Sequence, residues 1–216
     1  MKLDKKHENR LEFIAEGIDT TFANMVRRYS MSRVPVLAIS NVTFYDNNSA
    51  FWDEYVAHRL GLMPVTTPAK TPEGAEIVLS LDEQGPKIVY TTDFESSDKD
   101  ISIPKKIIII TLAQDQRLRL EAKATLGTGR KHAKFQAGLV SYGKEGDNIR
   151  FMVESFFHME PYEVIERGCD VITADIEAIE AALGVEKKPK KKAEKSEAKK
   201  EKKEKKSKKA EEKKEE

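Results

Sequence analysis

Cysteine is almost missing from this chain of 216 residues, in which Cys169 is the one example. A single thiol cannot form an internal disulfide, a four-thiolate zinc site or an iron–sulfur cluster. Such scarcity is typical of a protein from a reducing compartment. We expect Cys169 to be a small core residue rather than a reactive thiol.

Long apolar runs are missing as well. None approaches the ~20 residues that a membrane-spanning helix needs. The first ten residues are mostly charged, so we expect no secretory signal there. Together these features predict a soluble, cytoplasmic protein without a membrane partner.

Catalytic and metal-binding motifs are not found either. The sequence has no G-x-S-x-G nucleophile elbow, and no base can be assigned to Cys169. Asp53 and Glu54 occupy adjacent helical positions and point apart, which makes them a poor acid–base pair. The four histidines form neither a two-histidine helical pair nor a Cys/His cluster. We therefore expect no catalytic residues and no metal ligands in this chain.

The segment 127–134, GTGRKHAK, is the part of the sequence most similar to a phosphate-binding loop. Its two glycines and three cations could surround an anion. Its spacing is not that of a P-loop, however, and no helix clearly follows it. We favour a structural or docking loop over a nucleotide site.

The segment 186–216 differs sharply in composition from the rest of the chain. It has 16 Lys and 9 Glu with no Val, Ile, Leu or aromatic residue, so it is predicted to be a disordered, charged tail. Of the 38 Lys and Arg and 37 Asp and Glu in the chain, 22 and 28 remain for residues 1–185, a net charge of −6. The basic tail thus masks an acidic folded part.

The first part of the chain alternates between strand-like and helix-like patterns. Residues 11–15 have a period of two, which predicts a strand ending at Gly17. Asp19 is a suitable cap for a helix whose apolar stripe has helical spacing. That stripe comprises Phe22, Met25, Val26 and Tyr29.

The middle of the chain is mostly β-like. Residues 36–44 predict a strand, and a short helix follows from about Trp52 to Gly61, with Ser49 as its expected cap. Alternating or β-branched patterns predict the remaining strands at 77–81, 88–92, 106–112, 117–125 and 149–153. Residues 107–110 are expected to be the most fully buried of these.

The last predicted helix begins near Pro161, a favourable first-turn residue, and ends at Gly184. Its apolar residues are spaced 4, 3, 4, 3 and 4 apart, which is typical of a helix that packs along another helix. This apolar seam comprises Ile165, Cys169, Ile172, Ile176, Ile179 and Leu183. It is long for a domain with only two other short helices, so we expect a partner helix from a second chain.

Three strings, in this order, resemble one known family. They are TFANMVRRYSMSRVPVLAIS at 21–40, DEYVAHRLGLMPV at 53–65 and GTGRKHAKF at 127–135, followed by the terminal helix. Together they resemble the alpha-like chains of DNA-directed RNA polymerases: bacterial alpha, the archaeal member called D and the eukaryotic third-largest subunit. The resemblance covers residues 3–184, and the size is most similar to that of the archaeal member, without an appended DNA-binding domain.

The resemblance implies an α+β fold in two parts. A discontinuous dimerisation domain of antiparallel strands and helices would be formed by 1–40 and 149–185. An inserted, mostly β domain would span 41–148, and the tail would follow at 186–216. The function implied is that of a non-catalytic assembly subunit of DNA-directed RNA polymerase, a nucleotidyltransferase complex.

The resemblance also implies partners. The apolar stripe and seam would bind a smaller subunit of related fold, called L in archaea, and the two large catalytic subunits would dock on this dimer. Small subunits N and P would be neighbours, and DNA and RNA would be contacted only through the complex. Arg27 and Arg28 match the paired arginines of the family's first helix. The candidates for contact with the large subunits are Arg27, Arg28, His58, Arg59, Arg130 and His132; for Arg59 the alternative is an ion pair with Asp53 or Glu54.

One departure concerns metals. Some archaeal relatives have a cysteine-rich insertion with an iron–sulfur cluster, and eukaryotic relatives have zinc-binding cysteines. This chain passes from Phe135 to the strand at Ile149 without a cysteine. We therefore expect no cofactor.

Two other functions remain as alternatives. The first is a free-standing nucleic-acid-binding protein that acts through the basic tail, against which the acidic folded part argues. The second, which we rank last, is an enzyme that uses the 127–134 loop on a phosphorylated substrate.

Overall fold

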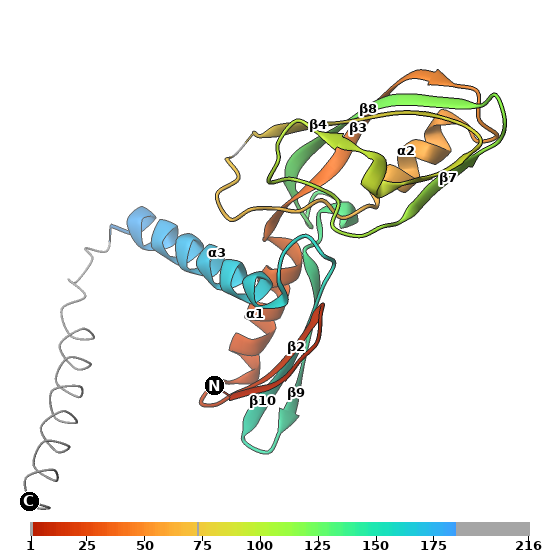
Figure 1. Cartoon of the computed structure of the whole chain (residues 1–216). Helices are drawn as coiled ribbons and strands as arrows, with labels where there is room; N and C mark the ends of the chain where they lie inside the picture. Colours follow the sequence, from red (N-terminus) through yellow and green to blue (C-terminus); the bar gives the residue numbers. More distant parts are fainter. Residues whose placement is uncertain (1, 73, 185–216) are drawn as a thin grey trace, which may run out of the picture. The chain divides into compact units, whose positions relative to one another are not determined.

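The computed structural model describes residues 2–72 and 74–184, so the predicted charged tail at 186–216 lies outside the described residues (Figure 1). Up to Asp175 the described chain forms one compact unit. Within the described part, no helix combines the length and the apolar character needed to cross a membrane.

One antiparallel sheet brings together both ends of this unit. Its strands are β1 (Lys2–Lys6), β2 (Arg10–Ala15), β10 (Asn148–Ser155) and β9 (Gly138–Glu145), in that order. Helix α1 (Thr20–Ser32) covers one face of this sheet, and α3 (Pro161–Ala182) follows β10. Strands from the two ends of the chain therefore share one core.

The middle of the chain forms a second β-rich region. A four-stranded sheet has the order β3 (Pro35–Asn47), β8 (Arg117–Thr128), β4 (Glu76–Gln84) and β6 (Glu95–Ser96). A two-stranded sheet pairs β5 (Lys87–Tyr90) with β7 (Ile108–Leu112). Helix α2 (Asp53–Gly61) and the short 3₁₀ turns η1 (Thr91–Asp93) and η2 (Ala133–Phe135) complete it.

Strand β3 belongs to both hydrophobic cores. Val36 and Ala38 contribute to the core beneath α1 and α3, whereas Leu37 and Ile39 contribute to the core of the β-rich region. Successive side chains of a strand point to opposite faces, so one extended segment can serve two cores. All four residues are buried.

Local sequence signals account for the first helix. Asp19 accepts a hydrogen bond at Oδ1 from the Phe22 amide, 2.8 Å away, which satisfies one of the free N–H groups of the first turn. Gly17 has a φ of 74°, a left-handed conformation that glycine adopts without steric cost. The cap and the turn thus lie where the sequence predicts them.

Several local predictions were wrong. Trp52, not Ser49, is the cap residue of α2, because Ser49 turns back to bond Asn47. Ile108 is half exposed, whereas its neighbours Ile109 and Ile110 are buried as predicted.

Strand β9 was not predicted, and it pairs with β10 along its whole length, from Gly138 to Glu145. It belongs to the sheet of the terminal segments, whereas the sequence-based boundary had assigned it to the inserted domain at 41–148.

Candidate protein-docking surfaces

Helices α1 and α3 cross with almost no space between them. A Cβ atom on Gly168 would lie 2.4 Å from Oγ and 3.2 Å from Cα of Ser30. Asp175 on α3 accepts hydrogen bonds from Tyr29 Oη at 3.0 Å and from Arg33 Nη2 at 3.2 Å. These contacts fix α1 against the part of α3 between Gly168 and Asp175.

The predicted dimer-interface residues divide into three groups in this structure. Val26 and Ile172 are buried in the chain's own core. Four others pack partly against that core: Met25, Tyr29, Ile165 and Cys169. The last four are exposed, by 42% for Phe22, 47% for Ile176, 58% for Ile179 and 73% for Leu183.

The apolar seam of α3 is therefore used in two ways. Its first half stabilises the chain itself, and the last two turns present aliphatic side chains to solvent. Burial, aided by the charge of Asp170, raises the pKa of the Cys169 thiol. A raised pKa disfavours the reactive thiolate, in agreement with a packing role for this residue.

Three of the predicted docking residues gather in a groove beside α1. The groove has a volume of about 790 Å³ and is lined by Arg27, Arg28, Arg33 and Arg130 together with Met25, Tyr29 and Met31, among others. Arg27 donates from Nε and Nη2 to Asn24 Oδ1, at 3.1 and 3.0 Å. The Arg130 amide donates to the Ser32 carbonyl at 3.1 Å, which brings the 127–134 loop to the end of α1.

Close packing explains the glycines of that loop. A Cβ atom on Gly129 would lie 2.5 Å from the Met31 carbonyl oxygen, and one on Gly127 would lie 2.7 Å from the Phe135 ring. Lys134 donates from Nζ to the Ile39 carbonyl at 2.9 Å, and burial, followed by the charge of Lys131, lowers its pKa. The geometry supports the structural interpretation of this loop.

The other three docking candidates lie elsewhere. His58 and His132 line a separate hollow of about 250 Å³ between β3, α2 and η2. Arg59 does not form the ion pair with Asp53 or Glu54 that was the alternative prediction for this residue. Its Nη2 donates to the Ile108 carbonyl at 2.8 Å, because the side chain reaches across to β7.

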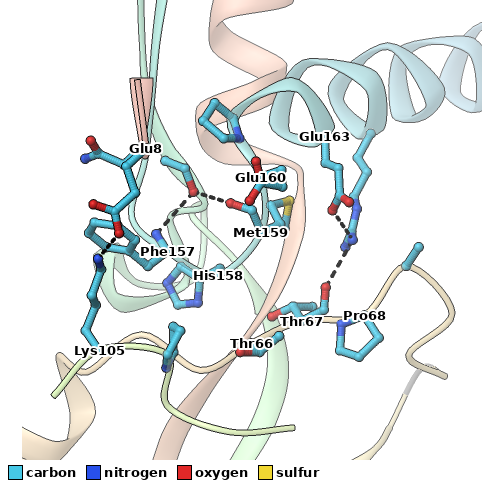
Figure 2. A pocket seen from close by; sticks show the side chains of 16 residues that line it. Glu8, Thr66, Thr67, Pro68, Lys105, Phe157, His158, Met159, Glu160 and Glu163 are labelled. Carbon is cyan, nitrogen blue, oxygen red and sulfur yellow. Dashed lines mark hydrogen bonds and ion pairs between the residues drawn. The ribbon is translucent and has the colours of Figure 1, made fainter. Parts of the chain in front are cut away.

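A cleft of about 430 Å³ separates the turn before α3 from the loops around Thr67 and Lys105, and Figure 2 shows its lining. Lys105 is paired with Glu8. Arg167 donates from Nη2 to Glu163 Oε2 at 2.9 Å and to the Thr67 carbonyl at 3.0 Å. The cations of the cleft are thus already bound to acceptors of this chain.

Thr67 connects several elements at this cleft. Its amide donates to the His158 carbonyl at 2.8 Å, and its Oγ1 accepts from the Leu37 amide at 2.9 Å. His158 is buried, and its Nδ1 lies 3.0 Å from the Val65 carbonyl. Burial lowers the pKa of His158, which the hydrogen bond with Val65 opposes only in part.

Sequence reasoning missed Thr67 and Arg167, because nothing in their local pattern indicates a long-range partner. Pro68, next to Thr67, indicates only an extended loop. Among residues 2–72 and 74–184, no cluster of three or more His, Cys, Asp or Glu side chains is arranged to hold a metal ion.

Comparison with known proteins identifies the β-rich region first. Residues 42–143 match the family described as the RNA polymerase Rpb3/RpoA insert domain. The class is therefore that of RNA polymerase chains with such an insert domain, and in this chain the matched residues lie between the paired strands β2 and β10.

Curated relatives give the particular family. The chain is 41% identical over 146 residues to DNA-directed RNA polymerase subunit Rpo3 of Pyrococcus furiosus, covering 64% of this chain and 56% of the relative. It is 42% identical over 149 residues to Rpo3 of Thermococcus kodakarensis, covering 65% and 58%. To Rpo3 of Methanocaldococcus jannaschii it is 35% identical over 159 residues, covering 73% of this chain and 82% of the relative.

The chain belongs to the family of DNA-directed RNA polymerase subunit Rpo3. It spans little more than half the length of the Pyrococcus and Thermococcus relatives.

Proposed function

We propose that this chain is a non-catalytic assembly platform of a DNA-directed RNA polymerase, working in the cytoplasm. It would contribute to nucleotidyl transfer by positioning other subunits and would supply no reacting group. Family membership supports this, since the relatives carry the name of a polymerase subunit. The observation that carries the proposal is the uncovered aliphatic end of α3.

A small alpha-like subunit of the L type is the partner proposed for that end. Ile176, Ile179 and Leu183 repeat with helical spacing and are all exposed in the chain alone. Complete burial of an aliphatic side chain stabilises an interface by about 1.5–3 kcal/mol. Three such residues on one helix would supply a helix-packing surface for the partner.

The groove with Arg27, Arg28 and Arg130 is proposed as the docking site of a large catalytic subunit. Guanidinium groups recognise carboxylates through paired hydrogen bonds, and arginine is enriched at the centres of protein interfaces. Met25 and Met31 add an apolar, adaptable part of the lining. The second large subunit and the small subunits N and P would bind other surfaces of the same heterodimer.

The assembly role requires no metal of the chain's own. With one cysteine in the sequence, neither a zinc site nor an iron–sulfur cluster can be formed from thiolates of this chain. Contact with DNA and RNA would be indirect, through the complex. The alternative of a free-standing nucleic-acid-binding protein receives no support from the relatives.

Reconstitution tests the proposal. The full chain, co-expressed with an L-type subunit, should give a stable 1:1 heterodimer that then recruits the large subunits. Double substitution of Ile176 and Ile179 by Glu should abolish the heterodimer, whereas Arg28→Glu should leave the heterodimer intact and weaken large-subunit recruitment. A chain that stays monomeric beside every small alpha-like subunit would falsify the proposal.

A further inference from the structure

The hollow beside His58 has features that the arginine groove lacks. Its volume is about 250 Å³, below the roughly 300–1,000 Å³ of drug-sized ligand sites. Its apolar lining comes from β3, from α2 and from the residue that follows α2: Ile39, Val42, Ala57 and Leu62. This size and lining suit one apolar side chain rather than a small-molecule ligand.

The polar rim of the hollow consists of hydrogen-bond donors. His132 accepts the Lys134 amide hydrogen at Nδ1, 3.1 Å away, which leaves Nε2 as the donor of its ring. Lys134 uses one ammonium hydrogen for the Ile39 carbonyl, which leaves two further donors. His58, on α2, is exposed and also lines the hollow.

No carboxylate lines the hollow, although residues 1–185 have a net charge of −6. A lining that combines donors and cations with aliphatic side chains complements a ligand with one apolar group and neighbouring carboxylates. Nucleic acid is a poorer fit, because the acidic remainder of the folded chain repels phosphates and a base is not aliphatic.

We propose that this hollow binds one aliphatic side chain from an acidic segment of another polypeptide, with adjacent carboxylates held by His132, Lys134 and His58. The inference rests on the proposed scaffold function, because it gives the chemistry of a second docking contact on the same subunit. The occupant belongs to a partner protein.

Peptide binding to the full chain tests this. The probe is a 12-residue peptide with one leucine between glutamates, followed by NMR shifts of the Lys134 and His58 amides. Matched peptides replace the leucine by serine or the glutamates by lysine, and a 12-nucleotide single-stranded DNA serves as the nucleic-acid probe. The acidic leucine peptide should bind at least about tenfold more tightly than the other three.

Two substitutions should weaken this binding about tenfold or more. Ala57→Leu fills the hollow, and His58→Glu places a carboxylate on its rim, where the charge repels the peptide. Lys144→Glu is the matched control: the same charge type is introduced at an exposed position of β9, and the affinity should be unchanged.

Equal binding of the lysine peptide, tighter binding of the DNA, or unchanged affinity in both hollow variants would overturn the inference. Failure of the scaffold proposal gives a different result. If the chain binds the acidic peptide but forms no heterodimer, the proposed binding site in the hollow is supported and the proposed scaffold function is refuted. If the heterodimer assembles normally and the peptide does not bind, only the proposed binding site is refuted.

Discussion

Ser30 of α1 and Gly168 of α3 touch where the two helices cross, at a distance that leaves no room for a methyl group on Gly168. Ser30 is fully buried, and its Oγ has no hydrogen-bond partner among the described residues. The crossing therefore depends on the missing side chain of a glycine inside a helix, where glycine is otherwise about 1 kcal/mol worse than alanine.

Gly168→Ala should lower the free energy of unfolding by about 1–3 kcal/mol, because the added methyl group forces α1 away from α3. Urea denaturation of the full chain measures this loss. Gly143→Ala is the matched control, since no atom lies within 4 Å of a Cβ at that position. It should change stability by no more than about 0.5 kcal/mol. Equal effects of the two substitutions would contradict this account of the crossing.

Ser30→Ala should be neutral or stabilising, because it removes a buried hydroxyl that makes no hydrogen bond. Combined with Gly168→Ala, it should recover part of the lost stability, since the closest contact, at Oγ, disappears. A double-mutant cycle in urea measures the coupling, which we expect to be about 0.5–3 kcal/mol. Strict additivity would show that the two residues do not act on each other.

Arg59→Ala should reduce stability by about 1–2 kcal/mol, because it removes the hydrogen bond from α2 to the Ile108 carbonyl of β7. Its neighbour on the same helix supplies the control. His58 is exposed, and His58→Ala should be neutral in thermal unfolding. If Arg59→Ala leaves the melting temperature unchanged, a structural role for this arginine is excluded.

The two halves of the α3 seam should respond differently to substitution. Ile172→Ala should cost about 2–5 kcal/mol in the chain alone, since this side chain is buried. Ile179→Glu should leave the unfolding free energy nearly unchanged and prevent association with the L-type subunit. Urea titration and analytical ultracentrifugation separate these effects. Loss of stability from Ile179→Glu in the isolated chain would be the contrary result.

Acid should destabilise the folded chain through His158. Burial lowers the pKa of this residue in the folded state, so the unfolded chain, with a histidine pKa near 6.5, binds the proton first. The stabilisation that neutral His158 contributes to the folded state is fully present above about pH 6.5 and is lost as the pH falls toward the pKa of the folded state.

Unfolding free energies measured between about pH 7.5 and 5 test this. His158→Asn keeps an N–H donor for the Val65 carbonyl and should flatten the pH dependence. His7→Asn, at an exposed position, is the control and should leave the dependence as it is. If His158→Asn leaves the pH dependence of the unfolding free energy unchanged, His158 is not its source.

Short-range signals in the sequence were sufficient for most elements. The alternation at Leu11, Phe13 and Ala15 and the cap at Asp19 depend on neighbouring residues, and both are confirmed by the structure. Strand β9 had no such signal, because it is an edge strand with one partner strand and only two or three inward-facing residues.

The candidate surfaces were harder to predict because they depend on distant residues. The sequence indicated Arg27, Arg28 and Arg130 as docking candidates. It could not show that the Arg130 amide donates to the Ser32 carbonyl and so brings Arg130 beside the two arginines of α1. It marked His58 and His132 without indicating that they share a hollow. The hydrogen bonds of Thr67 arise from a loop whose position is set by tertiary contacts alone.

The shared strand β3 has a consequence for how the molecule melts. Leu37 and its neighbour Val36 are buried in different hydrophobic cores. Because both residues belong to the same strand, unfolding of one core displaces the backbone that the other core needs. Calorimetry should accordingly show a single cooperative transition for residues up to Asp175, although the sheets of this segment are separate. Unfolding as one body would keep the arginine groove and the hollow beside His58, both within this unit, at fixed spacing until the whole unit unfolds.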